Sequence, residues 1–246
     1  DFREGYDLQG QMDPFTVAQV TELFDVELPI ETTGNFTADM AMTGPLGEPT
    51  VSAELMSQAQ ATIDQVDLAQ LDATVIYQGG SLTLEQLIAR PAAGGLLVGS
   101  GQYQFGQPGQ LTLSATGENL PADAIGQPYG LPEALTVGPV SLEANVSGPV
   151  GDLRGLVSWR APAGDYPARG NVEFAGNTLR FRDTTVVVAG GTVTGGGSLV
   201  AGRWRADLQA QGIQLGQLTD NLQGTAAGNA QLAGNLRDPQ DISGQG

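Results

Sequence analysis

The segment Gly34-Asn35-Phe36-Thr37-Ala38-Asp39-Met40-Ala41-Met42-Thr43-Gly44-Pro45-Leu46 decides how this chain is organised, because it recurs further along the sequence. A second copy runs from Gly138 to Val150, and a weaker third copy runs from Gly224 to Leu236. Self-similarity at a nearly regular spacing is typical of stacked, elongated repeat proteins. The sequence therefore predicts an extended array and not a globular enzyme built around one pocket.

Three further pairs of similar segments occur between these copies, and they come in the same order each time. The pairs are 77–84 with 174–181, 93–95 with 189–191, and 113–120 with 208–215. We therefore expect one continuous array over residues 1–246, with approximate units at 7–113, 114–208 and a truncated 209–246. Because the chain starts at Asp1 and stops inside a third repeat, we expect it to be a fragment of a longer protein.

Apolar and polar residues alternate along most of the chain. Phe36, Ala38, Met40 and Met42 are interleaved with polar residues, and Gly-containing turns separate such runs. A period of two is typical of strands with one apolar face, and glycine supplies the positive φ that tight hairpins require. The predicted fold class is all-β, an elongated antiparallel sheet curled lengthwise into a U-shaped trough, with one or more short helices.

One short helix is expected near the start of the chain. Asp13 is the predicted N-cap, Pro14 the first helical residue, and Val17, Val20 and Phe24 lie at helical spacing. The equivalent positions 120–125 and 215–218 predict shorter helices.

The composition excludes several kinds of chemistry. The 246 residues include no Cys, His or Lys, and 27 carboxylates against ten arginines give a net charge of −17. Imidazole bases, thiolate nucleophiles, zinc sites with His or Cys ligands and Schiff-base lysines are therefore absent. The acidity argues against nucleic acid and against an anionic membrane surface, although Arg180-Phe181-Arg182 and Arg203-Trp204-Arg205 are local basic clusters.

An enzyme would have to use carboxylates, and we expect none. A parallel β-helix that degrades polysaccharides is the enzymatic alternative, because that fold is also repetitive, acidic and rich in glycine. Its coil period of about 20–25 residues is not seen here. No cofactor or metal is expected. The carboxylates that could form a pair are Asp64, Asp67, Asp72, Glu85 and Asp183.

The turn that ends each repeated strand carries a resemblance to a known family. Gly44-Pro45-Leu46-Gly47-Glu48-Pro49 and Asn235-Leu236-Arg237-Asp238-Pro239 are two versions of it, whereas the segment from Gly148 to Leu153 lacks the final proline. With the Gly-Gly strands and the Leu-Pro segment, this pattern resembles the repeats of the TamB family, within the wider AsmA-like group. The resemblance covers essentially the whole chain.

The resemblance implies a location and a role. TamB-like proteins are anchored in the bacterial inner membrane and cross the periplasm to an outer-membrane barrel protein of the Omp85 type. Relatives occur in the chloroplast envelope. The roles proposed for them are phospholipid transfer between the two membranes and outer-membrane protein assembly. The expected partners are therefore phospholipid acyl chains and that barrel protein, with no nucleic acid. We expect the fragment to be monomeric or weakly associated through strand edges.

The residues expected to line the trough and contact lipid are the apolar members of the alternating runs. Only 6% of residues are aromatic, so the lining is rich in small and flexible side chains. A thin closed core, as in an adhesin or structural stalk, is the alternative. The predicted lining residues are Phe36, Ala38, Met40, Met42, Leu82, Leu84, Tyr103, Phe105, Leu111, Leu113, Val140, Leu142, Val146, Val157, Trp159, Val172, Phe174, Leu179, Phe181, Val186 and Val188.

Overall fold

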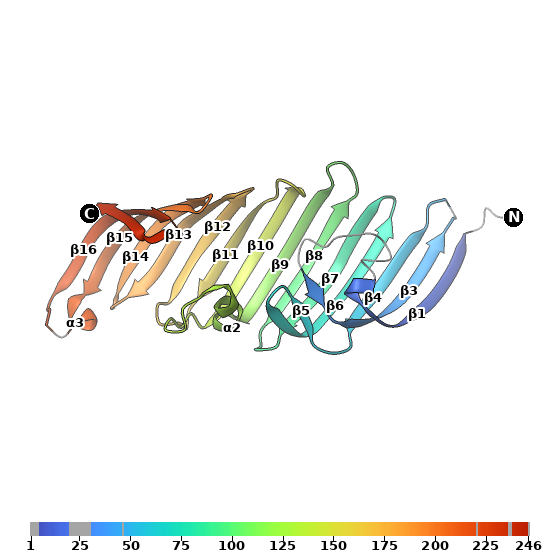
Figure 1. Ribbon diagram of the computed structural model, residues 1–246, viewed down its shortest axis with the longest axis horizontal. Helices are drawn as coiled ribbons and strands as arrows, with labels where there is room; N and C mark the ends of the chain where they lie inside the picture. The colour runs from blue at the N-terminus through green and yellow to red at the C-terminus, as the bar shows by residue number, and fades with distance from the viewer. Residues whose placement is uncertain (1–4, 20–30, 46, 220, 236–237, 246) are drawn as a thin grey trace.

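The protein is one open antiparallel sheet of 17 strands, elongated and curled along its length (Figure 1). The computed structural model describes residues 5–19, 31–45, 47–219, 221–235 and 238–245. The ends of the chain lie at opposite ends of the sheet (Figure 1). This architecture, with its few short helices, confirms the predicted fold class.

The strands follow one another across the sheet nearly in chain order. Every described strand pair is antiparallel, so these residues do not form a parallel β-helix. The bounds are β1 (Tyr6–Thr16), β2 (Thr32–Thr33), β3 (Asn35–Gly44), β4 (Thr50–Ser57), β5 (Ala61–Ile63), β6 (Val66–Gln78), β7 (Ser81–Pro91), β8 (Leu96–Gln104), β9 (Gln110–Pro121), β10 (Pro139–Pro149), β11 (Arg154–Ala161), β12 (Ala168–Ala175), β13 (Thr178–Val188), β14 (Gly191–Val200), β15 (Arg203–Gln214), β16 (Thr225–Asn235) and β17 (Asp238–Gln245).

The self-similar segments occupy equivalent places in two six-strand units. The three copies of the opening segment contain β3, β10 and β16. The first unit comprises β3, β4, β6, β7, β8 and β9, and the second comprises β10 to β15. The turns after β3 and β10 match as well, because Glu48 N–H donates to the Pro45 carbonyl and Asp152 N–H donates to the Pro149 carbonyl.

Helices follow β1, β9 and β15, and the two after β9 and β15 are short. They are a helix that begins at Val17, then α2 (Ala122–Gly126) with the 3-10 turn η1 (Gln127–Tyr129), and α3 (Leu215–Leu218). The sequence therefore predicted correctly that the two later positions are short helices. The remainder of the first expected helix, including Val20 and Phe24, lies outside the described residues.

The predicted start of the first helix is wrong. Asp13 and Pro14 lie within strand β1, where the register with β3 shifts between Met12 and Phe15. Proline is tolerated in such an edge strand because it has no N–H, and an edge strand does not need that N–H for pairing with a second neighbour. The cap is Thr16, whose hydroxyl accepts a bond from Gln19 N–H at 3.3 Å while Thr16 N–H donates to Gln19 Oε1 at 2.8 Å. This reciprocal pair is a capping box.

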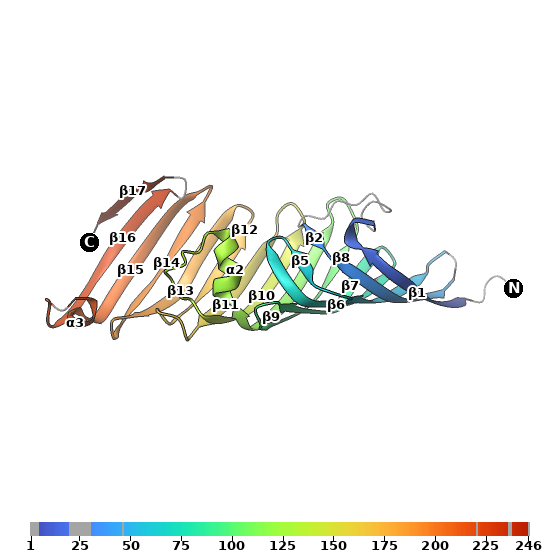
Figure 2. The same cartoon turned by 60° about the horizontal axis from the view of Figure 1, so that its bottom comes forward.

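A small ribbon covers part of one face of the sheet. β2 pairs with β5, and β5 pairs with the start of β6. β2 and β5 lie on the same side of the sheet as α2 (Figure 2). The main cluster of buried residues lies beneath this ribbon and comprises Phe36, Ala61, Leu68, Leu71 and Ala89. No helix in the described residues is both long and apolar enough to cross a membrane.

Candidate functional site

One face of the sheet is apolar along nearly its whole length, and we call it the apolar face. Residues paired directly across neighbouring strands point to the same side of a sheet, so the register identifies each face. A single row of paired residues crosses thirteen strands without a polar side chain. From β3 to β16 the row reads Met40, Ala53, Val75, Leu84, Gly101, Leu113, Val146, Gly155, Phe174, Leu179, Leu199, Trp204 and Gly234.

The opposite side, the polar face, has a different composition. The row formed by the residue next to each of these contains nine polar residues among its thirteen. It reads Ala41, Ser52, Ile76, Thr83, Gln102, Thr112, Ser147, Arg154, Ala175, Thr178, Val200, Arg203 and Asn235. The sheet is therefore two-sided, and only one side offers a continuous path to a hydrocarbon chain.

The register places the predicted lining residues on the apolar face. Twenty of them lie in strands, on the side that carries the row from Met40 to Gly234. Phe105 follows β8, and its ring lies edge-on to Tyr103 and Tyr77 with centroids 4.8 and 6.0 Å away. Phe36 and Ala38 are buried, whereas Met40 and Phe181 are each 39% exposed.

Sequence reasoning missed several residues of this face, among them Val75, Leu199, Trp204 and Leu208. Their signal was present, because Trp204 alternates with Arg203 and Arg205 in the same way as the predicted residues alternate with polar neighbours.

A roof closes over the apolar face next to the β2–β5 ribbon. The Tyr129 hydroxyl of η1 donates a hydrogen bond to the Asp64 carboxylate in the turn between β5 and β6. Both residues line a hollow of about 480 Å³. The hydrogen bond to the Asp64 carboxylate raises the pKa of Tyr129 above its usual 10.0, and desolvation of the hydroxyl raises it further. The apolar residues beneath the roof include Ile63, Val66, Leu68, Leu97, Leu120 and Ile125.

The second unit has an open apolar hollow of about 260 Å³. Both tryptophans of the chain, Trp159 and Trp204, line it from β11 and β15. Between them Gly195 and Gly197 of β14 lie opposite Leu208 and Ala206, so the floor is formed by backbone and small groups. Such a site can take a linear hydrocarbon chain between two flat indoles.

The total surface shows how open the molecule is. The accessible area is 15972 Å². A compact monomer of 25.4 kDa would expose only roughly 10,000 Å². Among the described residues only nine hydrophobic ones are buried, and none of these is a large side chain with less than 2% exposure. A large share of the apolar face is therefore only half-buried.

The carboxylates considered for catalysis do not gather into a cluster. The described residues contain no group of three or more acidic side chains placed to hold a metal ion. Asp64 accepts its bond from Tyr129, Asp67 accepts one from the Thr62 hydroxyl at 3.1 Å, and Asp72 accepts one from Gln70. The first two bonds join separate segments of the fold, and the third lies within β6.

Comparison with known proteins adds no relative, since no family model, curated protein or solved structure matches this chain.

Proposed function

We propose that the apolar face binds the acyl chains of phospholipids and that this segment serves as a conduit for them. The observation that carries the proposal is the apolar row across thirteen strands, together with the single sheet of the described residues, which leaves β11 to β14 without a second sheet facing them. An uncovered apolar surface of this extent on a folded protein usually marks a binding surface.

The energetics suit passage of a lipid. Each methylene removed from water contributes about 0.8 kcal/mol, so a two-tailed lipid gains greatly against water but little against another bilayer. No polar side chain interrupts the apolar row, so a lipid tail meets no polar barrier along it. Lipid tails would slide along the apolar face while the headgroups stay in solvent.

The resemblance to the TamB family extends this proposal to a place in the cell. We propose that the parent protein is anchored in the inner membrane, crosses the periplasm and passes phospholipid toward an Omp85-type barrel in the outer membrane. A closed-core adhesin or stalk, the structural alternative, would need a cover over the whole apolar face. The described residues provide one only around the β2–β5 ribbon and the short helices.

A second candidate function is assembly of outer-membrane proteins by strand addition. It is favoured by the outer edge of β1, which pairs only with β3 among the described strands. Such an edge can accept a strand from another chain through backbone hydrogen bonds. In that case β-strand peptides would bind to the protein and lipid tails would not compete with them.

The test of lipid binding uses the two tryptophans. Phosphatidylcholine brominated on its acyl chains is expected to quench the fluorescence of Trp159 and Trp204 in the wild-type protein. Leu208→Glu places a charge inside the hollow and should weaken quenching at least about tenfold, because a carboxylate against hydrocarbon is costly. The matched control is Gln209→Glu, the next residue on the polar face, which should quench normally.

A second pair of variants tests the far end of the same face. Met40→Glu should reduce the phospholipid seen by native mass spectrometry, whereas Ala41→Glu, on the polar face, should not. Met40 is already 39% exposed, so the variant is expected to fold, which circular dichroism checks. Wild-type protein that neither quenches with the brominated lipid nor carries phospholipid would overturn the conduit.

A further inference from the structure

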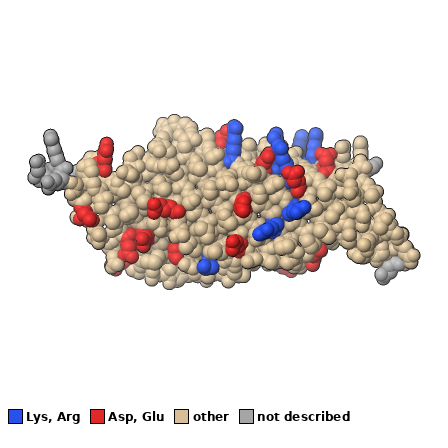
Figure 3. Space-filling model, turned by 180° about the vertical axis from the view of Figure 1, so that it is seen from behind, with Lys and Arg blue, Asp and Glu red and all other residues tan. Residues whose placement is uncertain are grey.

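The charge of the chain is divided unevenly along its length. Residues 1–138 contain 18 carboxylates and two arginines, whereas residues 139–214 contain six carboxylates and seven arginines. All seven of those arginines lie on the polar face of β11, β12, β13 and β15. Seen from this side, basic atoms gather towards the C-terminal half while the N-terminal half carries mostly acidic ones (Figure 3). Residues 139–214, which we call the basic region, therefore carry one net positive charge in a chain whose net charge is −17.

Two of these arginines face each other, and neither has an ion-pair partner among the described residues. Arg160 of β11 and Arg169 of β12 are direct cross-strand partners. Like charges placed directly opposite one another destabilise a sheet. Arg154 and Arg182 have carboxylate partners at 3.2 and 3.0 Å, but within the described part of the chain no carboxylate lies within 4.0 Å of either Arg160 or Arg169.

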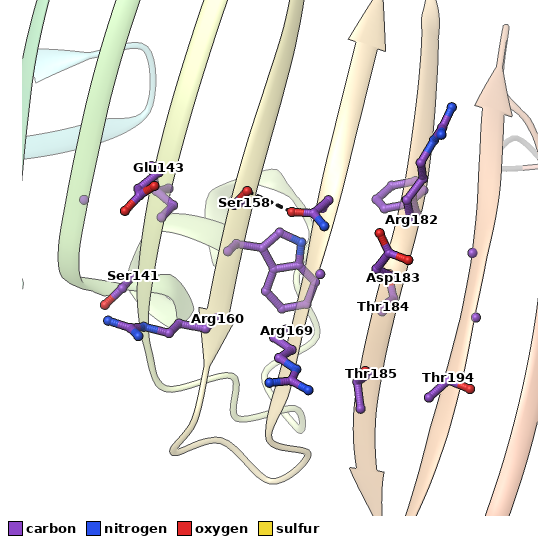
Figure 4. Close-up of a pocket in the computed structure, with 18 of the residues that line it drawn as sticks. Ser141, Glu143, Ser158, Arg160, Arg169, Arg182, Asp183, Thr184, Thr185 and Thr194 are labelled. Carbon is purple, nitrogen blue, oxygen red and sulfur yellow. Dashed lines mark hydrogen bonds between the residues drawn. The ribbon is translucent and has the colours of Figure 1, made fainter.

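Arg160 and Arg169 line a hollow on the polar face, next to register shifts in β12 and β13. The register shifts between Arg169 and Asn171 in β12, and between Phe181 and Thr184 in β13, where Asp183 takes a φ of +50°. Register shifts of this kind bend a sheet locally. The result is a depression of about 1150 Å³ over β9 to β14 (Figure 4).

Neutral hydrogen-bonding groups surround the two guanidinium groups. Arg160 is paired with Ser141 on its other side, and Figure 4 shows its head group lying toward that hydroxyl. Arg169 is paired on its other side with Thr185, which is in turn paired with Thr194. The hollow also contains the Ser158–Asn171 hydrogen bond and three carboxylates, those of Glu118, Glu143 and Asp183.

We propose that this hollow is a binding site for a phosphate-bearing group, held between Arg160 and Arg169. A guanidinium is a rigid fork of donors that matches phosphate oxygens two at a time. A planar carboxylate is satisfied by one such fork, whereas a tetrahedral phosphate can take donors from two strands at once. The hydroxyls of Ser141 and Thr185 supply further donors on either side. The ligand would also relieve the repulsion that the empty site carries.

The phosphate could come from a phospholipid headgroup or from a soluble phosphate ester, and the experiment separates them. Pyrophosphate is titrated into the protein by calorimetry at 150 mM salt, and vesicles of phosphatidylglycerol or of phosphatidylcholine are tested by flotation. Soluble glycerol phosphate is titrated in the same way as pyrophosphate. Flotation with phosphatidylglycerol alone assigns the headgroup, and binding of glycerol phosphate without flotation assigns the soluble ester.

The decisive variant is the double substitution Arg160→Gln and Arg169→Gln. Because each lost charge-assisted contact is strong, pyrophosphate binding should weaken at least about 30-fold. The control is Arg203→Gln with Arg205→Gln, which removes the same charge from the polar face outside this hollow. Both pairs of arginines are exposed, and the first variant should melt slightly higher because a repulsion is removed.

Two results would overturn the site. One is equal weakening by both double variants, which would indicate diffuse attraction to the basic region. The other is wild-type protein that binds none of the phosphate probes. Either result leaves the lipid-tail proposal intact, because the quenching variants lie on the apolar face.

Discussion

The two six-strand units present the same apolar face, but the first is roofed over part of it and the second is not. Five of the nine buried hydrophobic residues form one cluster beneath the β2–β5 ribbon. The second unit buries only Ala161 and Ile213 among its described hydrophobic residues. Equivalent strands thus reach different burial, and the largest buried cluster lies where the ribbon covers the sheet. Stability should be concentrated in the first unit and accessibility in the second.

The largest expected effect comes from removing a leucine in each unit. Leu68→Ala under the ribbon should cost about 3 kcal/mol in free energy of unfolding, because Leu68 is only 4% exposed. Leu208→Ala in the open hollow should cost less than about 1 kcal/mol. Urea denaturation of both variants measures the contrast. Equal losses would mean that the open face is covered in solution.

A smaller effect should separate two glycines of the apolar face. A methyl group on Gly195 would meet the Asp207 carbonyl oxygen at 2.2 Å, whereas one on Gly10 would meet nothing within 4 Å. Gly195→Ala should therefore destabilise by about 1–3 kcal/mol, and Gly10→Ala should be neutral or slightly stabilising. Thermal unfolding compares the two. A tolerated Gly195→Ala would show that β14 and β15 can move apart.

The smallest effect concerns the tie that holds the roof. Tyr129→Phe removes the bond to Asp64 and should lower the melting temperature slightly while increasing the binding of an apolar dye. Because the pKa of Tyr129 is raised, the bond contributes fully below pH 10 and is lost as the pH rises through that raised pKa. Wild type and variant should therefore converge in stability above pH 10. A difference that persists at high pH would contradict this.

Much of the sheet could be predicted from the sequence because its signal is local. Alternation fixes which side each residue of a strand faces, so Leu142 and Ser141 could be assigned to opposite sides before any pairing was known. Glycine-containing turns then marked the strand ends. The placement of Thr16 as the cap was missed, since Pro14 resembles a helix start as readily as an edge strand.

The remaining features depend on register, which one sequence does not reveal. Arg160 and Arg169 are nine residues apart, and only the pairing of β11 with β12 makes them opposite. Tyr129 and Asp64 are 65 residues apart and meet only because η1 reaches the turn after β5. The register shifts that hollow the polar face involve ordinary residues such as Asp183, whose positive φ has no clear sequence signal.

The number of strands per unit has a geometric consequence. From β1 to β9 and from β9 to β15 the sheet advances by six antiparallel steps each time, and six is even. Every strand that precedes a helix therefore runs in the same direction, so the helices all fall on one rim of the sheet. At about 4.8 Å per step, one unit adds roughly 29 Å in the direction across the strands. A chain of this design lengthens in fixed increments without exchanging its two rims.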